Sequence, residues 1–357
     1  MLRYLLNIPP SIHLILLISI PLLRLPTFLG DFYLEEESLL ILLGQRIADG
    51  HALYGDAWYA GPPLMPWLYA AFVKVFGGGA LPAIRIATCL YVYLSAVYFN
   101  GILAQHKLFR KDLGLTSLLY VLLVSTPWYT QQMSASLFVL LPMTIAFNQL
   151  MELGDKRSSN LQQMYLAGVW MMICILASYK AVFILVGLLI GYFLIRSPQV
   201  HELLALIGGL VVILGAVLYW MFYQGTLAAF WDIGVLYYWD RINLGTHEWY
   251  PFEVGQTLLS WLLAWGSVLL FALIGFFHFR IRFFSYVVKV RAAEVAMATW
   301  LAGVSLMLLF KYSRLELTDF VLLVPPIVFY AKKLLDFSWF RRLRWFVLLA
   351  TIAVPIS

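Results

Sequence analysis

The sequence predicts an all-α membrane protein of about eleven transmembrane helices, with amphipathic helices lying at the membrane surface in the first external loop. Hydrophobic residues make up 63% of the 357 residues, and charged residues only 12%. The mean hydropathy is +0.86. A chain with so little charge cannot cover a water-soluble core, and its apolar runs recur along the whole sequence.

These apolar runs give the order of the predicted spans, because crossing the hydrocarbon takes about 20 mostly apolar residues. The first run is not followed by a small-residue cleavage site, so we expect it to be retained as a span. No internal repeat is found, and we expect residues 1–357 to form a single integral-membrane domain. The runs lie near 11–29, 80–104, 114–130, 134–152, 164–178, 181–196, 203–223, 255–279, 292–311, 318–331 and 345–356.

The charges predict the orientation. With a cytoplasmic N-terminus, most of the 24 basic residues fall in the cytoplasmic segments, as the positive-inside rule requires. Most of the acidic residues then face outward. Helical spans with basic inner loops favour the bacterial inner membrane over the outer membrane of the cell envelope, where β-barrels prevail.

Two predicted external segments are longer than simple connections, residues 30–79 and 224–254. In the first, a helical run from Ser38 to Ala48 ends at a glycine-rich turn, and Pro62-Pro63 restarts a helix at Leu64. Both helices are short for a span, and we expect them to lie on the membrane surface.

Three adjacent carboxylates, Glu35, Glu36 and Glu37, precede the leucines of this first helix. Neighbouring carboxylates repel one another, so the pKa of at least one should rise unless a cation or solvent compensates. The simpler interpretation is a solvated first turn, in which acids interact favourably with the helix dipole.

The segment that follows resembles a family. The triplet, "LLILLGQRIADG", "ALYGDAWYAGPPLMPWLYAAFVKVFGG" and Arg85 in "LPAIRIA" are similar, in order and spacing, to the first external loop of the GT-C superfamily. This superfamily of polytopic sugar transferases includes the protein O-mannosyltransferases and the aminoarabinose transferase acting on lipid A. Weaker similarity continues in "STPWYTQQMSASLF", "LASYKAVFILVG" and "KYSRLELTDFVLLVPP".

The resemblance implies inverting transfer of a sugar from a polyprenyl-phosphate donor to an external lipid, glycan or protein acceptor. It implies a carboxylate as general base and cations at the leaving phosphate. Glu36 is the first candidate base, followed by Glu35 and Glu37. The chain departs from the family in two ways: Glu stands where Asp is usual, and the second external loop has Gln131, Gln132, Ser134 and Ser136 but no carboxylate.

Candidate substrate-binding residues are Lys180, Arg314, Lys311, Asp56, Trp58 and Arg85. Lys180 interrupts a long apolar stretch, and an intramembrane cation is costly enough to suggest a function. The alternatives are that Lys180 extends to the membrane surface, that Arg314 pairs with Glu316 or Asp319, and that Asp56 and Trp58 are ordinary turn and interface residues.

Two further function classes stay open. A non-catalytic membrane subunit would retain the architecture as a scaffold for partner subunits, and a transporter would use Lys180 between two short helices. We expect no cofactor beyond the lipid-linked donor, and neither a metal site nor nucleic acid, because the histidines are scattered and the positive charge marks inner loops. Cys89 and Cys174 are expected to be buried thiols.

Overall fold

The computed structural model describes residues 9–29, 35–106, 113–127, 130–155, 160–239, 266, 268–276, 288–309 and 317–335. Within these ranges the chain is helical apart from turns and one isolated β-bridge between Leu53 and Ala57. The all-α prediction is confirmed. The predicted span at 345–356 lies outside the described residues, and so does most of the predicted span at 255–279. Of the external segment 224–254, the structure describes residues 224–239.

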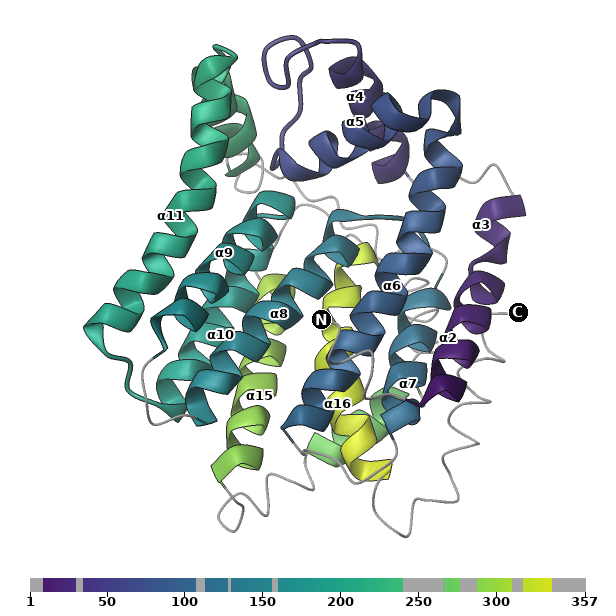
Figure 1. Ribbon diagram of the computed structural model, residues 1–357, viewed down its shortest axis with the longest axis vertical. Helices are drawn as coiled ribbons and strands as arrows, with labels where there is room; N and C mark the ends of the chain where they lie inside the picture. Colours follow the sequence, from purple (N-terminus) through teal and green to yellow (C-terminus); the bar gives the residue numbers. More distant parts are fainter. Residues whose placement is uncertain are drawn as a thin grey trace.

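The larger helices form a bundle (Figure 1). By length and composition, three stretches can cross a membrane: Leu64–Gln105, Ala135–Glu152 and Val200–Tyr223. Shorter apolar helices accompany them in the described part of the chain. The bundle helices are α2 (Pro10–Leu23), α6 (Ala80–Gln105), α7 (Leu113–Ser125), α8 (Ala135–Asp155), α9 (Leu161–Ala177), α10 (Ala181–Ile195), α11 (Val200–Tyr223), α15 (Val288–Leu309) and α16 (Val324–Leu335).

Two helices cover one end of the bundle, α4 (Glu35–Ala48) and α5 (Leu64–Phe76) (Figure 1). We call this end the cap end. The two pack closely at Gly44, where a Cβ atom would lie 2.9 Å from the backbone carbon of Tyr69. The predicted start of α5 at Leu64 is confirmed. Gly77, with φ of 52°, then turns the chain through η1 (Gly77–Gly79) into α6.

The first predicted span is not one helix. α2 ends at Leu23, and the short α3 (Leu25–Leu29) follows Arg24, so the apolar run predicted as the first span, 11–29, is divided between two helices. The physical reason is Arg24, whose side chain is 1% exposed. Its guanidinium donates to oxygens at the end of α7 and in the loop that follows: the Val124 carbonyl and Ser125 hydroxyl of α7, and the carbonyls of Thr130 and Gln131 in the loop.

Glycines bring the bundle helices into close contact. A Cβ on Gly209 of α11 would lie 2.1 Å from the Tyr165 carbonyl oxygen of α9, and one on Gly187 of α10 would lie 2.4 Å from the Thr299 carbonyl oxygen of α15. Small residues at helix contacts are typical of membrane bundles, where packing rather than hydrophobicity joins the helices.

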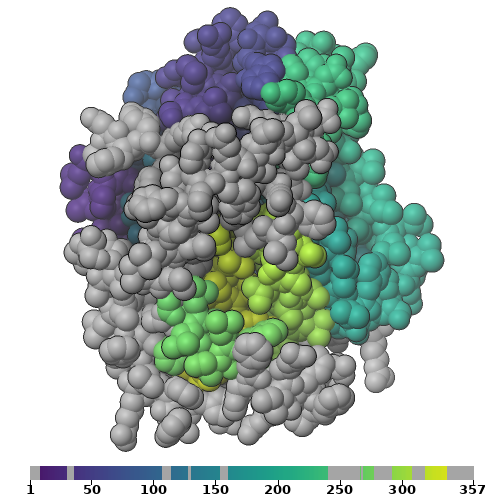
Figure 2. Space-filling model, turned by 180° about the vertical axis from the view of Figure 1, so that it is seen from behind, coloured from purple at the N-terminus to yellow at the C-terminus, as the bar shows by residue number. Residues whose placement is uncertain are grey.

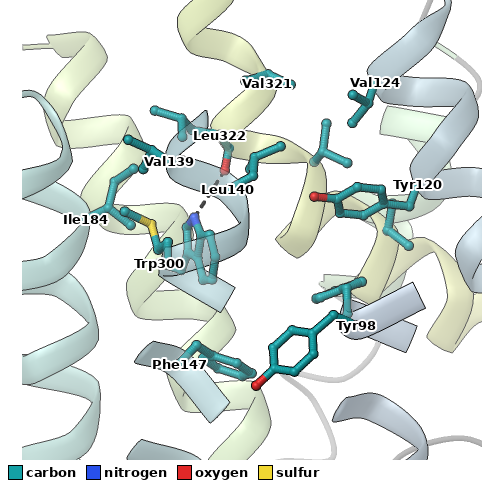
Figure 3. Packing of buried hydrophobic residues seen from close by; sticks show 14 of the residues in the cluster. Tyr98, Tyr120, Val124, Val139, Leu140, Phe147, Ile184, Trp300, Val321 and Leu322 are labelled. Atoms are coloured by element: carbon teal, nitrogen blue, oxygen red, sulfur yellow. Dashed lines mark hydrogen bonds between the residues drawn. The ribbon is translucent and has the colours of Figure 1, made fainter. Parts of the chain in front are cut away.

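The bundle core places the segment before α16. This segment is η4 (Leu317–Leu323), a seven-residue 3₁₀ helix that runs directly into α16. The buried indole of Trp300 in α15 donates to the Leu322 carbonyl at 3.0 Å (Figure 3). Phe147 of α8 packs edge-on against the Trp300 ring, with the ring centroids 6.0 Å apart. The second half of η4 is therefore anchored in the core.

Candidate active site

The glutamate triplet forms the first turn of α4 at the cap end. Helix α4 thus begins three residues earlier than predicted. The Glu35 side chain lies outside the described residues. The Glu36 side chain is half-buried, and its Oε1 accepts a hydrogen bond of 3.0 Å from the backbone N–H of Ala135, the first residue of α8. Glu36 therefore points toward the bundle, at a helix N-terminus where a carboxylate is stabilised.

Glu37 points toward the bundle interior and is 2% exposed. Its Oε2 lies 3.9 Å from Nη2 of Arg85, whose Nη1 donates to the Thr27 carbonyl. Neither carboxylate oxygen of Glu37 receives a hydrogen bond from the described residues. Burial raises the pKa of Glu37 to about 7, while the positive charge of Arg85 acts in the opposite direction. Arg85, a candidate for substrate binding, thus bridges α4, α6 and the end of α3.

The described residues of the second loop, between α7 and α8, are buried, and two of them have a structural role. Gln131 donates to the carbonyls of Leu23 and Ser125, at 3.3 and 3.1 Å. Ser134 accepts a 3.1 Å hydrogen bond from the Leu137 amide and so caps α8. Together with Arg24, these bonds fix the path of the loop toward the first turn of α8.

Lys180 lies at the turn between α9 and α10 and does not extend to the surface. Its Nζ is 2.7 Å from Oδ2 of Asp319 in η4, and both side chains are largely buried. Oδ1 of Asp319 accepts a 2.6 Å hydrogen bond from the Ser136 hydroxyl. Ser136 directly follows Ala135, whose amide binds Glu36, so the contacts of Glu36 and Asp319 fall on consecutive residues of α8. The structure therefore brings Glu36, Asp319 and Lys180 to the first turn of α8.

Asp319 is the residue that the sequence analysis missed as part of this site, since it was considered only as a partner of Arg314. It supplies to the second loop the carboxylate that the loop itself lacks. Ser136 and Asp319 are 183 positions apart, so no local pattern pairs them. The available signal was that an acid, Asp319, stands within the mainly apolar run "LTDFVLLVPP".

The glycine-rich turn of the first loop docks on the far side of the cap end. Tyr54, at φ of 70°, packs edge-on against Phe230, with ring centroids 5.2 Å apart. Phe230 begins η3 (Phe230–Tyr237), a π-helical segment after α11 and the one-turn α12 (Leu227–Ala229). Figure 2 shows the first-loop residues and this segment adjacent at the top of the molecule.

Two candidate residues lie on this turn, away from the Glu36 contact. Asp56 is exposed, and its Oδ2 accepts a 2.9 Å hydrogen bond from the Ala52 amide, which closes the turn. Trp58 is 56% exposed and packs edge-on against Tyr237 at 5.3 Å. Both have the local contacts expected of turn and interface residues. Lys311 and Arg314 lie outside the described residues.

A solved structure shares this architecture. The crystal structure of ArnT from Cupriavidus metallidurans, bound to undecaprenyl phosphate, superposes with a TM-score of 0.60. The chain therefore shares the fold of ArnT. The match covers 93% of this chain and 61% of ArnT at 15% sequence identity, so the likeness is one of fold. No family model and no curated protein sequence matches the chain. With its membrane-length apolar helices, the chain is an integral membrane protein.

Proposed function

We propose that the chain is a GT-C-type glycosyltransferase that moves a sugar from a polyprenyl-phosphate donor to an acceptor on the outer face of the bacterial inner membrane. The fold supports this proposal, since ArnT adopts it and binds undecaprenyl phosphate in the crystal. The observation that carries it is the meeting of Glu36 with the Lys180–Asp319 pair at the first turn of α8.

Glu36 is the proposed general base. It takes the proton of the acceptor hydroxyl, the acceptor oxygen bonds to the anomeric carbon, and the bond from that carbon to the phosphate oxygen breaks with inversion. The Ala135 N–H orients the carboxylate for this step. A carboxylate held by a backbone amide of a helix can compensate for the longer side chain of Glu relative to Asp, because its position is fixed at its oxygen.

The positive charge for the leaving phosphate comes from Lys180. Arg314 and Lys311, which precede η4 in sequence, are proposed as further phosphate contacts. Arg85 has a different role in this scheme. It holds Glu37, and with it the first turn of α4, against the bundle, so that the neighbouring Glu36 faces Ala135.

A second candidate function is a non-catalytic membrane subunit with the same fold. The observation that favours it is charge pairing: Lys180 is already matched by Asp319, and Glu37 faces Arg85. In a non-catalytic subunit these ion pairs would serve to join the helices, and neither Lys180 nor Glu37 would need to contact a substrate.

A measurement of lipid-linked glycans distinguishes the two functions. The glycans are analysed by mass spectrometry in cells that lack the native gene and express either the wild-type chain or a variant. For the enzyme, Glu36→Gln abolishes the glycan product that the wild-type chain restores, because loss of a general base costs about 10²–10⁴ in rate. Asp49→Asn, which removes an exposed charge just after α4, is the matched control and restores the product. Normal product from a folded Glu36→Gln protein would favour the subunit.

A further inference from the structure

The ion pair at the α9–α10 turn has a feature that the proposed reaction does not explain. Lys180 is the proposed phosphate cation, yet its Nζ is bonded to a carboxylate of the same chain, Asp319, at 2.7 Å. The other oxygen of that carboxylate accepts from the Ser136 hydroxyl at 2.6 Å. A carboxylate of the protein thus binds the Lys180 ammonium and the Ser136 hydroxyl at the end of the bundle where the donor phosphate is expected.

The donors around Asp319 are those that bind phosphate. A lysine ammonium and a serine hydroxyl are phosphate ligands as readily as carboxylate ligands. A polyprenyl-phosphate sugar is a phosphodiester with one negative charge, the same charge as an aspartate. Exchanging one for the other leaves the buried charge of the site unchanged, whereas adding the phosphate beside Asp319 would place two like charges together at a high cost.

The segment that carries Asp319 has an uncommon conformation. Runs of 3₁₀ helix longer than three or four residues are uncommon, and 3₁₀ stretches within a helix often mark a hinge or a strained sequence. η4 has seven residues and is continuous with α16. Trp300 anchors it at Leu322, beyond the position of Asp319. The half that bears the carboxylate therefore lies on the side of the segment away from this anchor.

We propose that the Asp319 carboxylate is a resident anion: it binds Lys180 and Ser136 when no donor is bound, and the phosphate of the lipid-linked donor displaces it. This inference rests on the proposed function, because it takes that donor as the ligand. Binding breaks the Lys180–Asp319 and Ser136–Asp319 contacts and replaces both with contacts to phosphate oxygens. The return of Asp319 after transfer then competes with the polyprenyl phosphate product and helps its release.

The test is the affinity of the purified full chain in detergent for geranylgeranyl phosphate, a short polyprenyl phosphate, measured by isothermal titration calorimetry. Lys180→Met should weaken binding at least about tenfold, because the cation is lost. Asp319→Asn should tighten it about tenfold, because the competing charge is gone while the side-chain shape is kept. Asp232→Asn removes an exposed charge from η3 and should leave the affinity unchanged.

If a folded Asp319→Asn protein bound geranylgeranyl phosphate no more tightly than wild type does, the proposal that Asp319 is a resident anion would be overturned. If this variant does not fold, hydrogen–deuterium exchange of the wild-type chain decides: geranylgeranyl phosphate should speed exchange of amides in 317–323, and unchanged or slower exchange rejects the proposal. If wild type binds and Lys180→Met weakens binding while Asp319→Asn does not tighten it, this inference alone fails. If wild type does not bind at all, the proposed function fails with it.

Discussion

Buried charges at the cap end are stabilised in different ways. Arg24 donates to neutral oxygens near the second loop, and Lys180 has a close carboxylate. Among the described residues, Glu37 has an ion pair with Arg85 at 3.9 Å and no hydrogen bond. A guanidinium tolerates neutral acceptors because its charge is delocalised over five donors. A carboxylate without hydrogen bonds instead becomes easier to protonate. The pKa of Glu37, raised by burial to about 7, makes its charge depend on pH near neutrality.

Glu37→Gln should remove a pH dependence of stability. The folded protein keeps a proton on Glu37 up to a pKa of about 7, whereas the unfolded chain releases it near 4.5. Between these values the folded state binds more protons, so the wild-type free energy of unfolding falls as pH rises, by on the order of 3 kcal/mol. Melting temperatures in detergent at pH 5 and pH 8 measure this. The gap between Glu37→Gln and wild type should widen in favour of the variant at pH 8; parallel profiles would contradict the burial of this carboxylate.

At the scale of elements, the sequence predicts helices well where the signal is local. Pro62-Pro63 marks the start of α5, and the apolar runs mark α6 and α8–α11 to within a few residues. The contacts of Arg24 were not predictable, because they are made to carbonyls about a hundred positions away. The same holds for the site: the triplet and Lys180 were identified individually, but their common contact at α8 depends on how distant helices pack.

The contact between α9 and α11 gives a matched pair of variants in one helix. A Cβ on Gly209 would lie 2.1 Å from the Tyr165 carbonyl oxygen, whereas one on Gly215 meets nothing within 4 Å. Gly209→Ala must push the helices apart, at a cost of about 1–3 kcal/mol. Gly215→Ala should be neutral or stabilising by up to about 1 kcal/mol, since Ala favours helix. Thermal unfolding in detergent compares them, and equal melting temperatures would mean that α11 does not pack on α9 as described.

At the scale of the whole molecule, the two ends of the bundle differ. At the cap end lie the short helices α4 and α5, the docked turn of the first loop, and the contacts of Glu36 and Asp319 with the first turn of α8. At the opposite end, ion pairs join neighbouring helices, including Arg196 with Glu202 and Lys333 with Glu294. Access to a lipid-linked donor and an external acceptor requires that the cap end face outward.

Cysteine labelling tests this orientation. In a background without Cys89 and Cys174, His51→Cys lies on the exposed first-loop turn and Ser197→Cys on the exposed connection between α10 and α11. A membrane-impermeant maleimide should label the first cysteine in intact spheroplasts and the second only after permeabilisation. The reverse pattern would put the candidate site in the cytoplasm and exclude a periplasmic transferase.

The central claim is that Glu36 and Lys180 act together on a lipid-linked sugar at the first turn of α8. Its most direct test is an assay of the purified protein, to which a pool of lipid-linked sugar donors and an extract containing the acceptor are added. Mass spectrometry then measures the polyprenyl phosphate that is released. We predict release by wild type, loss of about 10²-fold or more in both Glu36→Gln and Lys180→Met, and normal release by Asp49→Asn. Equal release by wild type and the two site variants, or no release by any of them, would contradict the account.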